Sequence, residues 1–340
     1  MDQETATIDS RGSTTGLTDI DRSRLVLVVV PCLNEEATIA RVVEGIPKAI
    51  DGADRVEVLV IDDGSSDDTA VRARAAGAEV LSHASNMGLG WTFSHAVRTA
   101  LLKGAAVMVN IDGDGQFDPG DVPTLVAPVL AGEADMVTAS RFADRALIPE
   151  MPVVKKFGNY AVARIVQLLT GRRFHDVSCG FRALSSEALL RMNLFGTFTY
   201  TQESFLDLVF KDMEIVEIPV KVRGVREFGR SRIASSIPRY AWRSLKIMLG
   251  AFISYKPFAF FSILAAAFMA VALALLGFLG VHYLLAGRFT PHIWAGFVGG
   301  SFGFLAISTL TTGFVGELLL RIRRNQERML YLLRRLVPGG

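Results

Sequence analysis

Two carboxylates and an amide follow an apolar run at alternate positions of the segment VNIDGDGQ. Asp112, Asp114 and Gln116 come directly after residues 107–111, whose apolar side chains predict a buried strand. Because alternate residues of an extended segment point the same way, the three side chains would reach one point in space. Oxygen ligands of this kind suit Mg²⁺ or Mn²⁺ that also carries a phosphate. The alternative interpretation is a solvated acidic loop.

Two earlier apolar runs also end in polar turns. VVVPCLNEE places Pro31, Leu33 and Glu35 after the first run, and VLVIDDGSSDDT places Asp62 and Asp63 after the second. Backbone N–H groups and carboxylates at such turns can hold the base, ribose or phosphates of a nucleotide sugar. Each motif also has a structural alternative. Glu35 could be a first-turn helix charge, and the second motif could be a helix-capping Asp/Ser turn.

Strands and helices that alternate from Leu25 to about Phe142 must position these turns. Apolar runs predict strands at 25–30, 56–61, 78–82, 106–111 and 136–139, and the first helix is expected to be capped by Asn34. This alternation predicts an α/β fold with a mainly parallel sheet covered on both faces. Ligands of such sheets bind beyond the carboxyl ends of the strands, where all three acidic turns fall.

The following region is less regular. Helices are expected at 152–169, 185–192 and 202–210, a strand at 215–220, and a basic loop at 224–231. We assign 1–24, which is rich in Thr, Ser and Asp, to a disordered lead and 25–235 to the catalytic domain. Residues 236–256 mix basic and apolar side chains and are expected to form an amphipathic helix in a membrane interface.

The tail carries two long uncharged segments, Phe258–Ala286 and Phe289–Val315. Each exceeds the roughly 20 apolar residues that cross a bilayer, so 257–320 is expected to be a transmembrane hairpin with spans at about 258–286 and 290–316. Small residues such as Gly296 and Gly299 would let the two helices pack closely. A buried apolar helix pair in a soluble protein is the alternative.

Basic residues are concentrated before the first span and after the second. The positive-inside rule therefore predicts an integral protein of the inner or plasma membrane with a cytoplasmic catalytic domain. The basic tail at 321–340 is expected to lie on the inner leaflet or to pair with a second subunit in a homo-oligomer.

Composition excludes several classes of protein. The 36 Lys and Arg nearly balance the 34 Asp and Glu, and there is no zinc-finger spacing, so no nucleic-acid partner is expected. The two cysteines, Cys32 and Cys179, lie in different motifs, which argues against a disulfide framework. A dinucleotide-dependent dehydrogenase is disfavoured because no G-x-G-x-x-G follows the first strand.

The order of P-x-x-N-E, D-D-G-S-x-D-x-T and D-x-D-x-Q resembles glycosyltransferase family 2. The match is closest to polyprenyl-phosphate glycosyltransferases of the dolichol-phosphate mannosyltransferase type, and the two-helix tail resembles their membrane-anchored bacterial members. This resemblance implies a GT-A fold and a divalent metal, Mg²⁺ or Mn²⁺. It also implies inverting sugar transfer from a nucleotide-diphosphate donor, of the GDP-mannose or UDP-glucose type, to a polyprenyl or dolichyl phosphate.

The resemblance also implies roles for single residues. The nucleotide sugar would be held by Pro31, Leu33, Glu35, Asp62, Asp63, Asp112 and Gln116, and the metal by Asp112, Asp114 and Gln116. Catalytic roles would fall to Asp114, Arg141, Asp176, Arg226 and Arg232. The acceptor phosphate would contact Ser178, Arg182, Ser231 and Arg232. Leu33 stands where the family has an aromatic residue, and Arg232 where a lysine is usual.

An acceptor phosphate is ionised at neutral pH, so transfer to it needs no strong general base. This fits a site rich in carboxylates and arginines, since no histidine stands in the acidic motifs and His175, the only one near a candidate site residue, is interpreted as structural. Three alternatives stay open: a membrane transferase with a sugar or glycolipid acceptor, a processive synthase, and an inactive membrane scaffold. The synthases carry Q-x-x-R-W, which the nearest segment here, RYAWRS, does not match. The intact D-x-D-x-Q motif disfavours the scaffold.

Overall fold

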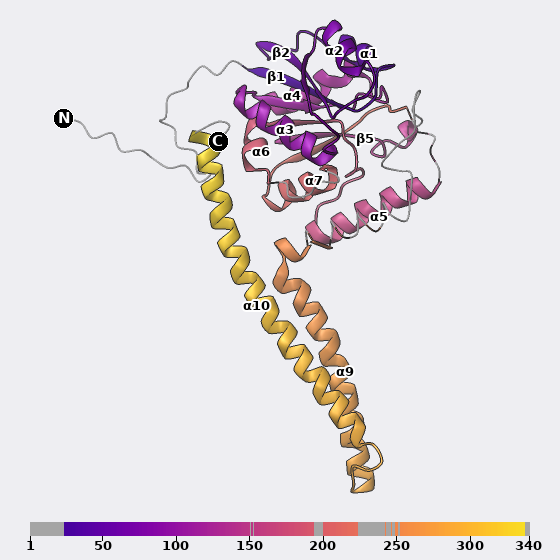
Figure 1. Ribbon diagram of the computed structural model, residues 1–340. Coiled ribbons are helices and arrows are strands. Elements are labelled where there is room, and N and C mark those ends of the chain that lie inside the picture. The colour runs from indigo at the N-terminus through magenta and orange to yellow at the C-terminus, as the bar shows by residue number, and fades with distance from the viewer. Residues whose placement is uncertain are drawn as a thin grey trace, which may run out of the picture.

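The computed structural model describes residues 24–149, 151, 153–193, 200–223, 242, 246, 249, 250 and 252–336. They form an α/β domain from which two long helices project together (Figure 1). Most of the predicted interface helix at 236–256 lies outside the described residues. The same holds for Arg226, Ser231 and Arg232, whose predicted roles therefore stay predictions.

A seven-stranded sheet forms the centre of the domain, in the order β3-β2-β1-β4-β6-β5-β7. Its strands are β1 (Leu25–Cys32), β2 (Arg55–Asp62), β3 (Glu79–Ser82), β4 (Val107–Asn110), β5 (Met136–Ser140), β6 (Arg182–Ser185) and β7 (Ile215–Pro219). All neighbours pair in parallel except β6, which is antiparallel to β4 and β5. The predicted strands are confirmed. The sequence pattern does not predict β6, because its residues RALS include a charge and form no continuous apolar run.

Helices cover both faces of the sheet, as the alternating pattern predicts. Val26, Val28 and Val30 of β1 pack with α1 (Ile39–Gly45), α2 (Thr69–Ala75) and α4 (Val122–Leu130). Leu25 and Leu27 point to the other face, where α3 (Leu89–Leu102), α5 (Val153–Thr170), α6 (Ser186–Arg191) and α7 (Thr201–Phe210) pack. Every residue of β1 is buried, which is typical of a central parallel strand.

The start of α1 differs from the prediction. Thr38, not Asn34, precedes the helix, and Asn34 has a positive φ of 53°. Its side-chain oxygen instead accepts from the backbone N–H of Ser66 at 2.8 Å, which joins the first two polar turns. Asn tolerates this left-handed backbone better than most residues, so the turn replaces the predicted cap.

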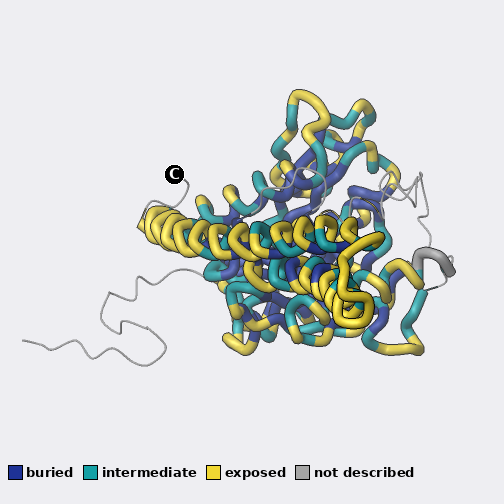
Figure 2. The backbone as a smooth tube through the Cα atoms, turned by 90° about the horizontal axis from the view of Figure 1, so that it is seen from below, coloured by how far each residue is buried: buried dark blue, intermediate teal, exposed yellow. Residues whose placement is uncertain are grey.

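Helices α9 (Pro257–Ala286) and α10 (Ile293–Leu336) are long and apolar enough to cross a membrane. Figure 2, which views the molecule from the hairpin side, shows both helices largely exposed. Leu285 and Phe297 are 84% and 75% exposed, which does not fit a buried helix pair in a soluble protein. The helices pack closely at glycines: a Cβ atom on Gly299 would lie 3.0 Å from Leu276, and one on Gly313 would lie 3.0 Å from Phe261.

The helix of the second predicted span continues into the basic tail. α10 runs without a break to Leu336, well beyond residue 316, where the span is expected to end. Its last turns lie beside α6 of the α/β domain (Figure 1). The basic tail is therefore a continuation of the second apolar helix, and within the described residues it packs against the α/β domain.

Candidate active site

The carboxyl ends of four strands meet at one edge of the sheet. Strands β1, β2 and β4 are neighbours in parallel pairs, and β5 shares their direction because both β4 and β5 are antiparallel to β6. The turns that follow them carry Leu33, Asp63, Asp112 and Arg141. This is the edge at which open α/β sheets bind ligands.

Four of the predicted site residues line one pocket at this edge. Asp112 and Gln116 come from the loop after β4, Arg141 follows β5, and Ser178 precedes β6. The remaining wall is formed by Phe117, Pro149, Met151, Cys179, Gly180, Val222 and Arg223. Residues from well-separated parts of the chain therefore converge on a space with both negative and positive side chains.

The carboxylate of Asp112 rests against the backbone of Gly180. A Cβ atom on Gly180 would lie 3.1 and 3.3 Å from the two Asp112 oxygens and 3.2 Å from the hydroxyl of Tyr200. Asn110, which sequence reasoning did not single out, supports this wall from inside, because its amide nitrogen donates to Gly180 O at 2.9 Å and to Tyr200 Oη at 2.7 Å. Only glycine at position 180 leaves room for the Asp112 carboxylate.

Hydrogen bonds within the D-x-D-x-Q loop and to two neighbouring segments hold the rest of this loop. Asp114 is buried, and its Oδ1 accepts from the backbone N–H of Gln116 at 3.0 Å. Gln116 donates from Nε2 to Arg223 O at 2.9 Å, and Thr38 at the start of α1 donates to Gly113 O at 2.7 Å. Asp112 thus faces the pocket, while Asp114 shapes the loop behind it.

Arg141 is fixed at the pocket wall by Asp176. Its Nε donates to Asp176 Oδ2 at 2.6 Å and its Nη2 donates to Oδ1 at 2.9 Å. The Asp176 carboxylate is fully buried and also accepts from the backbone N–H of Ser178 at 3.1 Å. Because these donors orient the carboxylate, Asp176 is better suited to position Arg141 than to act as a base.

Asp62 and Asp63 are both buried at the end of β2. Asp62 accepts from the backbone N–H of Ser65 at 3.0 Å. Asp63 accepts from the N–H groups of Met87 and Gly88 at 2.8 and 2.9 Å, and from His83 Nδ1 at 2.8 Å. In these contacts the two carboxylates hold the turn after β2 and the segment that leads into α3. Any contact of Asp63 with a nucleoside would have to share these oxygens.

His83 and His95, which were not assigned a role from the sequence, lie next to Asp63. His83 Nε2 lies 3.0 Å from His95 Nδ1, and the two rings stack at 5.3 Å. Burial, the neighbouring His83 and Arg98 lower the pKa of His95 below its ordinary value. The histidines lie in a loop and a helix outside the acidic motifs, so their approach to Asp63 has no local sequence signal.

The first polar turn lies where the sequence predicts it, with Pro31, Leu33 and Glu35 at the sheet edge. The contacts of these residues with a nucleotide sugar stay predictions. Pro31 is buried within β1, and Leu33 and Glu35 are half-buried in the turn after it. The backbone N–H of Glu35 donates to Thr69 Oγ1 at 2.8 Å, which ties this turn to the start of α2. They lie at the predicted sheet edge, beside the turn that holds Asp62.

Arg182 lies in the interior, where the placement does not support a contact with an acceptor phosphate. Its Nη1 donates to Thr201 O at 2.7 Å and to Ser204 Oγ at 2.9 Å, and its Nη2 donates to Val177 O at 3.0 Å. Burial lowers its pKa, and the nearby Tyr200 and Asp176 oppose that effect. The guanidinium therefore joins the segment before β6 to the first turn of α7.

Two further residues of the pocket wall were not assigned a role from the sequence. Arg223 stands just before the basic loop and forms part of the wall. Cys179 is 1% exposed, and burial together with Asp176 raises the pKa of its thiol to about 12. At neutral pH that thiol is protonated and is not a nucleophile.

A family model described as Glycosyl transferase family 2 matches residues 27–191 of the chain. The chain is 28% identical over 225 residues to undecaprenyl-phosphate mannosyltransferase of Micrococcus luteus, which covers 62% of this chain and 88% of the relative. It is 27% identical over 322 residues to dodecaprenyl-phosphate galacturonate synthase of Rhizobium johnstonii, with 90% of each chain covered. The second match extends beyond the α/β domain into the apolar helices.

Among solved structures, the chain is similar to glucosyl-3-phosphoglycerate synthase from Mycobacterium tuberculosis in complex with Mn²⁺, uridine diphosphate and phosphoglyceric acid. The TM-score is 0.52 at 27% identity, covering 67% of this chain and 78% of that one. The likeness and the family match confirm the predicted GT-A-like α/β fold.

Proposed function

The chain belongs to glycosyl transferase family 2, and from this premise we propose that it transfers a sugar from a nucleotide-diphosphate donor to a polyprenyl phosphate at a membrane. The product would be a lipid-phosphate-linked sugar formed with inversion. The two named relatives support the acceptor class, since each carries a polyprenyl phosphate in its name. They differ in their sugar, so the donor, of the GDP-mannose or UDP-glucose type, rests on the motifs alone.

The pocket between Asp112 and Arg141 is the observation that carries this proposal. It combines a carboxylate from the loop after β4 with a guanidinium that Asp176 holds by two hydrogen bonds. An arginine with fixed geometry suits the oxygens of a diphosphate, because its planar fork makes paired contacts. Arg141 would stabilise the charge that develops on the leaving nucleoside diphosphate.

The residues present fit a divalent cation. Asp112 lines the pocket, Gly180 leaves room for its carboxylate, and Asp114 and Gln116 lie in the same loop. Mg²⁺ is usually held by only one or two carboxylates together with substrate phosphates, which this donor set allows. The Mn²⁺ and uridine diphosphate of the solved neighbour support the same expectation. When bound, the metal would neutralise charge on the diphosphate.

The chemistry of the pocket wall favours a phosphate as the acceptor. Among the described residues that line it there is no histidine, glutamate or lysine, and the carboxylate of Asp112 would be engaged by the metal. A sugar hydroxyl would need a base to take its proton, whereas a phosphate oxygen is already ionised at neutral pH. Ser178 and Arg223 belong to the wall and would contact such an anion.

The apolar hairpin supports an acceptor in the membrane. The start of α9 lies beside the end of α5, because Lys256 Nζ donates to Leu169 O at 3.0 Å. Phe157 and Leu168 of α5 are 75% and 71% exposed and would face the bilayer at the same level. With the basic residues on this side of the hairpin, we propose a cytoplasmic catalytic domain at the inner membrane.

The test uses membranes that contain the full chain, a panel of radiolabelled nucleotide sugars, and Mg²⁺ or Mn²⁺. The wild-type chain should move label from one donor into the organic-extractable lipid, and a chelator should abolish the transfer. Asp112→Asn should remove it as well. Asp118→Asn is the matched control, since Asp118 caps a short turn by accepting from the N–H of Gly120.

The other outcomes separate the alternatives. Label in a polymer or in a glycolipid without phosphate would favour a synthase or another acceptor. Label on a water-soluble phosphate would match the phosphoglyceric acid of the solved neighbour instead of a lipid. The absence of metal-dependent turnover with every donor would favour an inactive scaffold.

A further inference from the structure

Helix α10 is much longer than a membrane span requires. Its 44 residues measure about 66 Å at 1.5 Å per residue, whereas the hydrocarbon core of a bilayer is about 30 Å thick. The apolar part ends near Val315, and the helix then runs on to Leu336 alongside the α/β domain (Figure 1). The last turns of α10 therefore lie outside the membrane.

One face of α10, here called the stripe, carries glycines in the apolar part of the helix and mainly charged residues beyond it. On this stripe, Gly313 and Gly316 pack against Phe261 and Pro257 of α9. Further along the same face lie Leu320, Arg323, Glu327, Tyr331 and Arg334, each buried or half-buried in a helix that is otherwise mostly exposed there. The spacing of three and four residues keeps all of them on one side of the helix. The stripe thus packs on α9 within the membrane and on the α/β domain beyond it.

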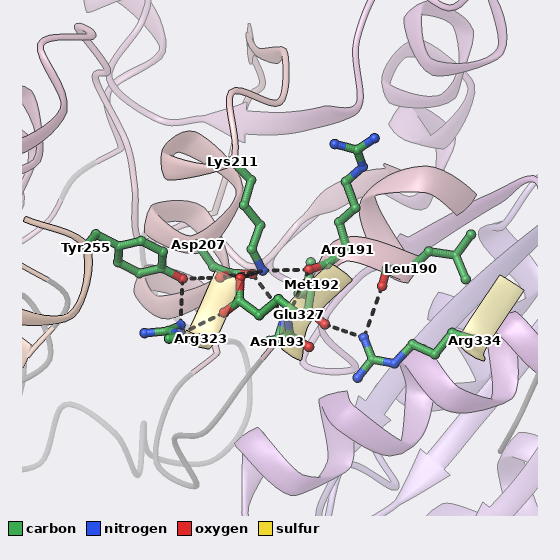
Figure 3. A network of polar contacts seen from close by, with 10 residues as sticks. All are labelled: Leu190, Arg191, Met192, Asn193, Asp207, Lys211, Tyr255, Arg323, Glu327 and Arg334. Atoms are coloured by element: carbon green, nitrogen blue, oxygen red, sulfur yellow. Dashed lines mark hydrogen bonds and ion pairs between the residues drawn. The ribbon is translucent and has the colours of Figure 1, made fainter. Parts of the chain in front are cut away.

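The lower contact of this stripe comprises Asp207, Lys211, Tyr255, Arg323 and Glu327 (Figure 3). Asp207, in α7, is 2% exposed and accepts from the hydroxyl of Tyr255 and from Lys211 Nζ at 2.8 Å. Arg323 donates from Nη2 to Tyr255 Oη at 3.2 Å and from Nε to Glu327 Oε1 at 2.8 Å. A network of buried and half-buried charges that satisfy one another favours a single arrangement of the segments that carry them.

Tyr255 connects the lower contact to the first membrane helix. It stands two residues before α9, and its ring stacks on Phe210 at the end of α7, with the centroids 4.6 Å apart. Burial and the neighbouring Asp207 raise the pKa of its hydroxyl, so it stays protonated and donates. Both helices of the hairpin are therefore joined to α7 at one place.

The upper contact comprises Glu187, Leu190, Met192, Tyr331 and Arg334. Arg334 donates from Nη1 to Leu190 O at 3.1 Å and to Met192 O at 2.8 Å, which satisfies carbonyls at the end of α6 (Figure 3). Tyr331 donates to Glu187 Oε2 at 3.1 Å. Arg323 and Arg334 lie about three helical turns apart, so the two contacts fix both the position and the direction of α10.

The helices held by these contacts also support the pocket. α7 begins at Thr201, whose carbonyl accepts from Arg182, and Arg182 joins it to Val177 in the segment that leads to Ser178 at the pocket wall. A shift of α10 against α6 and α7 would therefore move the membrane relative to the pocket.

We infer that the lower and upper contacts together hold the pocket at a fixed height above the membrane, with Arg323 and Arg334 as positioning residues for a phosphate presented by the bilayer. The inference rests on the proposed function. A lipid phosphate is confined to the plane of the membrane surface, so its effective concentration at the pocket depends on that height. A short phosphate that reaches the pocket from solution does not depend on it.

The test compares two acceptors with the full chain reconstituted in liposomes: a long-chain polyprenyl phosphate in the bilayer, and geranyl phosphate added from solution. Arg323→Gln and Arg334→Gln are expected to lower transfer to the bilayer acceptor roughly tenfold or more, while the rate with geranyl phosphate stays within about twofold. Arg324→Gln and Arg335→Gln are matched controls, because these neighbouring arginines are exposed and belong to neither contact. They should behave like the wild-type chain with both acceptors.

Each other outcome overturns the inference. Equal rates with the bilayer acceptor in variants and wild type would show that the contacts do not set the height. Parallel loss with both acceptors would show that they support the site itself. Failure of the wild-type chain to use any lipid phosphate, with every donor, would reject the proposed function and the inference with it.

Discussion

Arg141 and Asp176 form a two-point ion pair in which Nε and Nη2 of the guanidinium donate to the two carboxylate oxygens at 2.6 and 2.9 Å. The Asp176 side chain is fully buried, whereas that of Arg141 keeps 21% of its surface at the pocket. Asp176 thus orients the guanidinium, and Arg141 presents part of its surface at the pocket.

Asp176→Asn tests whether Asp176 orients Arg141. The amide has the same size but cannot accept from Arg141 with both terminal atoms, so the guanidinium loses its fixed direction. We expect kcat to fall about 10- to 100-fold, with little change in the melting temperature of the purified protein. Steady-state kinetics with the identified donor measure the effect. An unchanged kcat with normal folding would show that Asp176 does not act through Arg141.

Gly180→Ala tests the room that the Asp112 carboxylate needs. The added methyl group would lie 3.1 Å from Asp112 Oδ2 and 3.2 Å from Tyr200 Oη, so the carboxylate must shift. We expect Mn²⁺ to bind roughly tenfold more weakly in the presence of nucleoside diphosphate, as titration calorimetry would measure. Gly158→Ala is the control, because a Cβ atom there meets nothing within 4 Å. Equal Mn²⁺ affinity in both variants would remove Asp112 from the metal site.

The two cysteines are expected to be inert. Burial raises the pKa of both thiols, helped by Asp62 at Cys32 and by Asp176 at Cys179. Because only the thiolate reacts, iodoacetamide at about pH 8 should leave the folded protein unmodified and label both sites after denaturation. Mass spectrometry reads the result. Labelling of Cys179 in the folded protein would mean that this part of the pocket wall opens in solution.

His95 is expected to make the fold sensitive to acid. Burial, His83 and Arg98 lower its pKa in the folded protein below the ordinary 6.5. As the pH falls below about 6.5, the unfolded chain takes up a proton that the folded protein resists, so stability is present above that pH and is lost as pH falls through the folded pKa.

The variant His95→Asn removes the titrating ring and should lose less stability than the wild-type chain between about pH 7.5 and about pH 5.5. Thermal unfolding in detergent at the two pH values measures this. An identical loss in the wild-type chain and the variant would assign the acid sensitivity to other groups.

The sequence predicts those elements whose pattern is carried by residues that are neighbours in the chain. Apolar runs give the strands, and the polar turn after each run places Asp112 and Arg141 at one sheet edge, since strand direction is shared. The hairpin follows from the length of two uncharged segments. In each case a few neighbouring residues carry the whole pattern.

The parts that are not predicted depend on pairs of residues far apart in the chain. Nothing local to Asp176 indicates Arg141 as its partner, and nothing near His83 indicates Asp63. The same holds for the basic residues after Glu317, where a charged amphipathic helix fits a membrane surface, a second subunit or the α/β domain equally well. The structure selects the α/β domain through Arg323 and Arg334. Arg182 is of a residue type that often binds phosphate, yet its guanidinium is buried and donates to Thr201 O in the interior.

The most direct test of the proposed reaction compares polyprenyl phosphate with the corresponding polyprenol, using the purified full chain, the identified labelled donor and divalent metal. We expect one nucleoside diphosphate to be released for each sugar that enters the lipid phosphate. We expect no transfer to the alcohol, because the metal would engage the Asp112 carboxylate and no other described residue of the pocket wall is suited to take a hydroxyl proton. Equal transfer to the alcohol would contradict the account and assign the pocket to a hydroxyl acceptor.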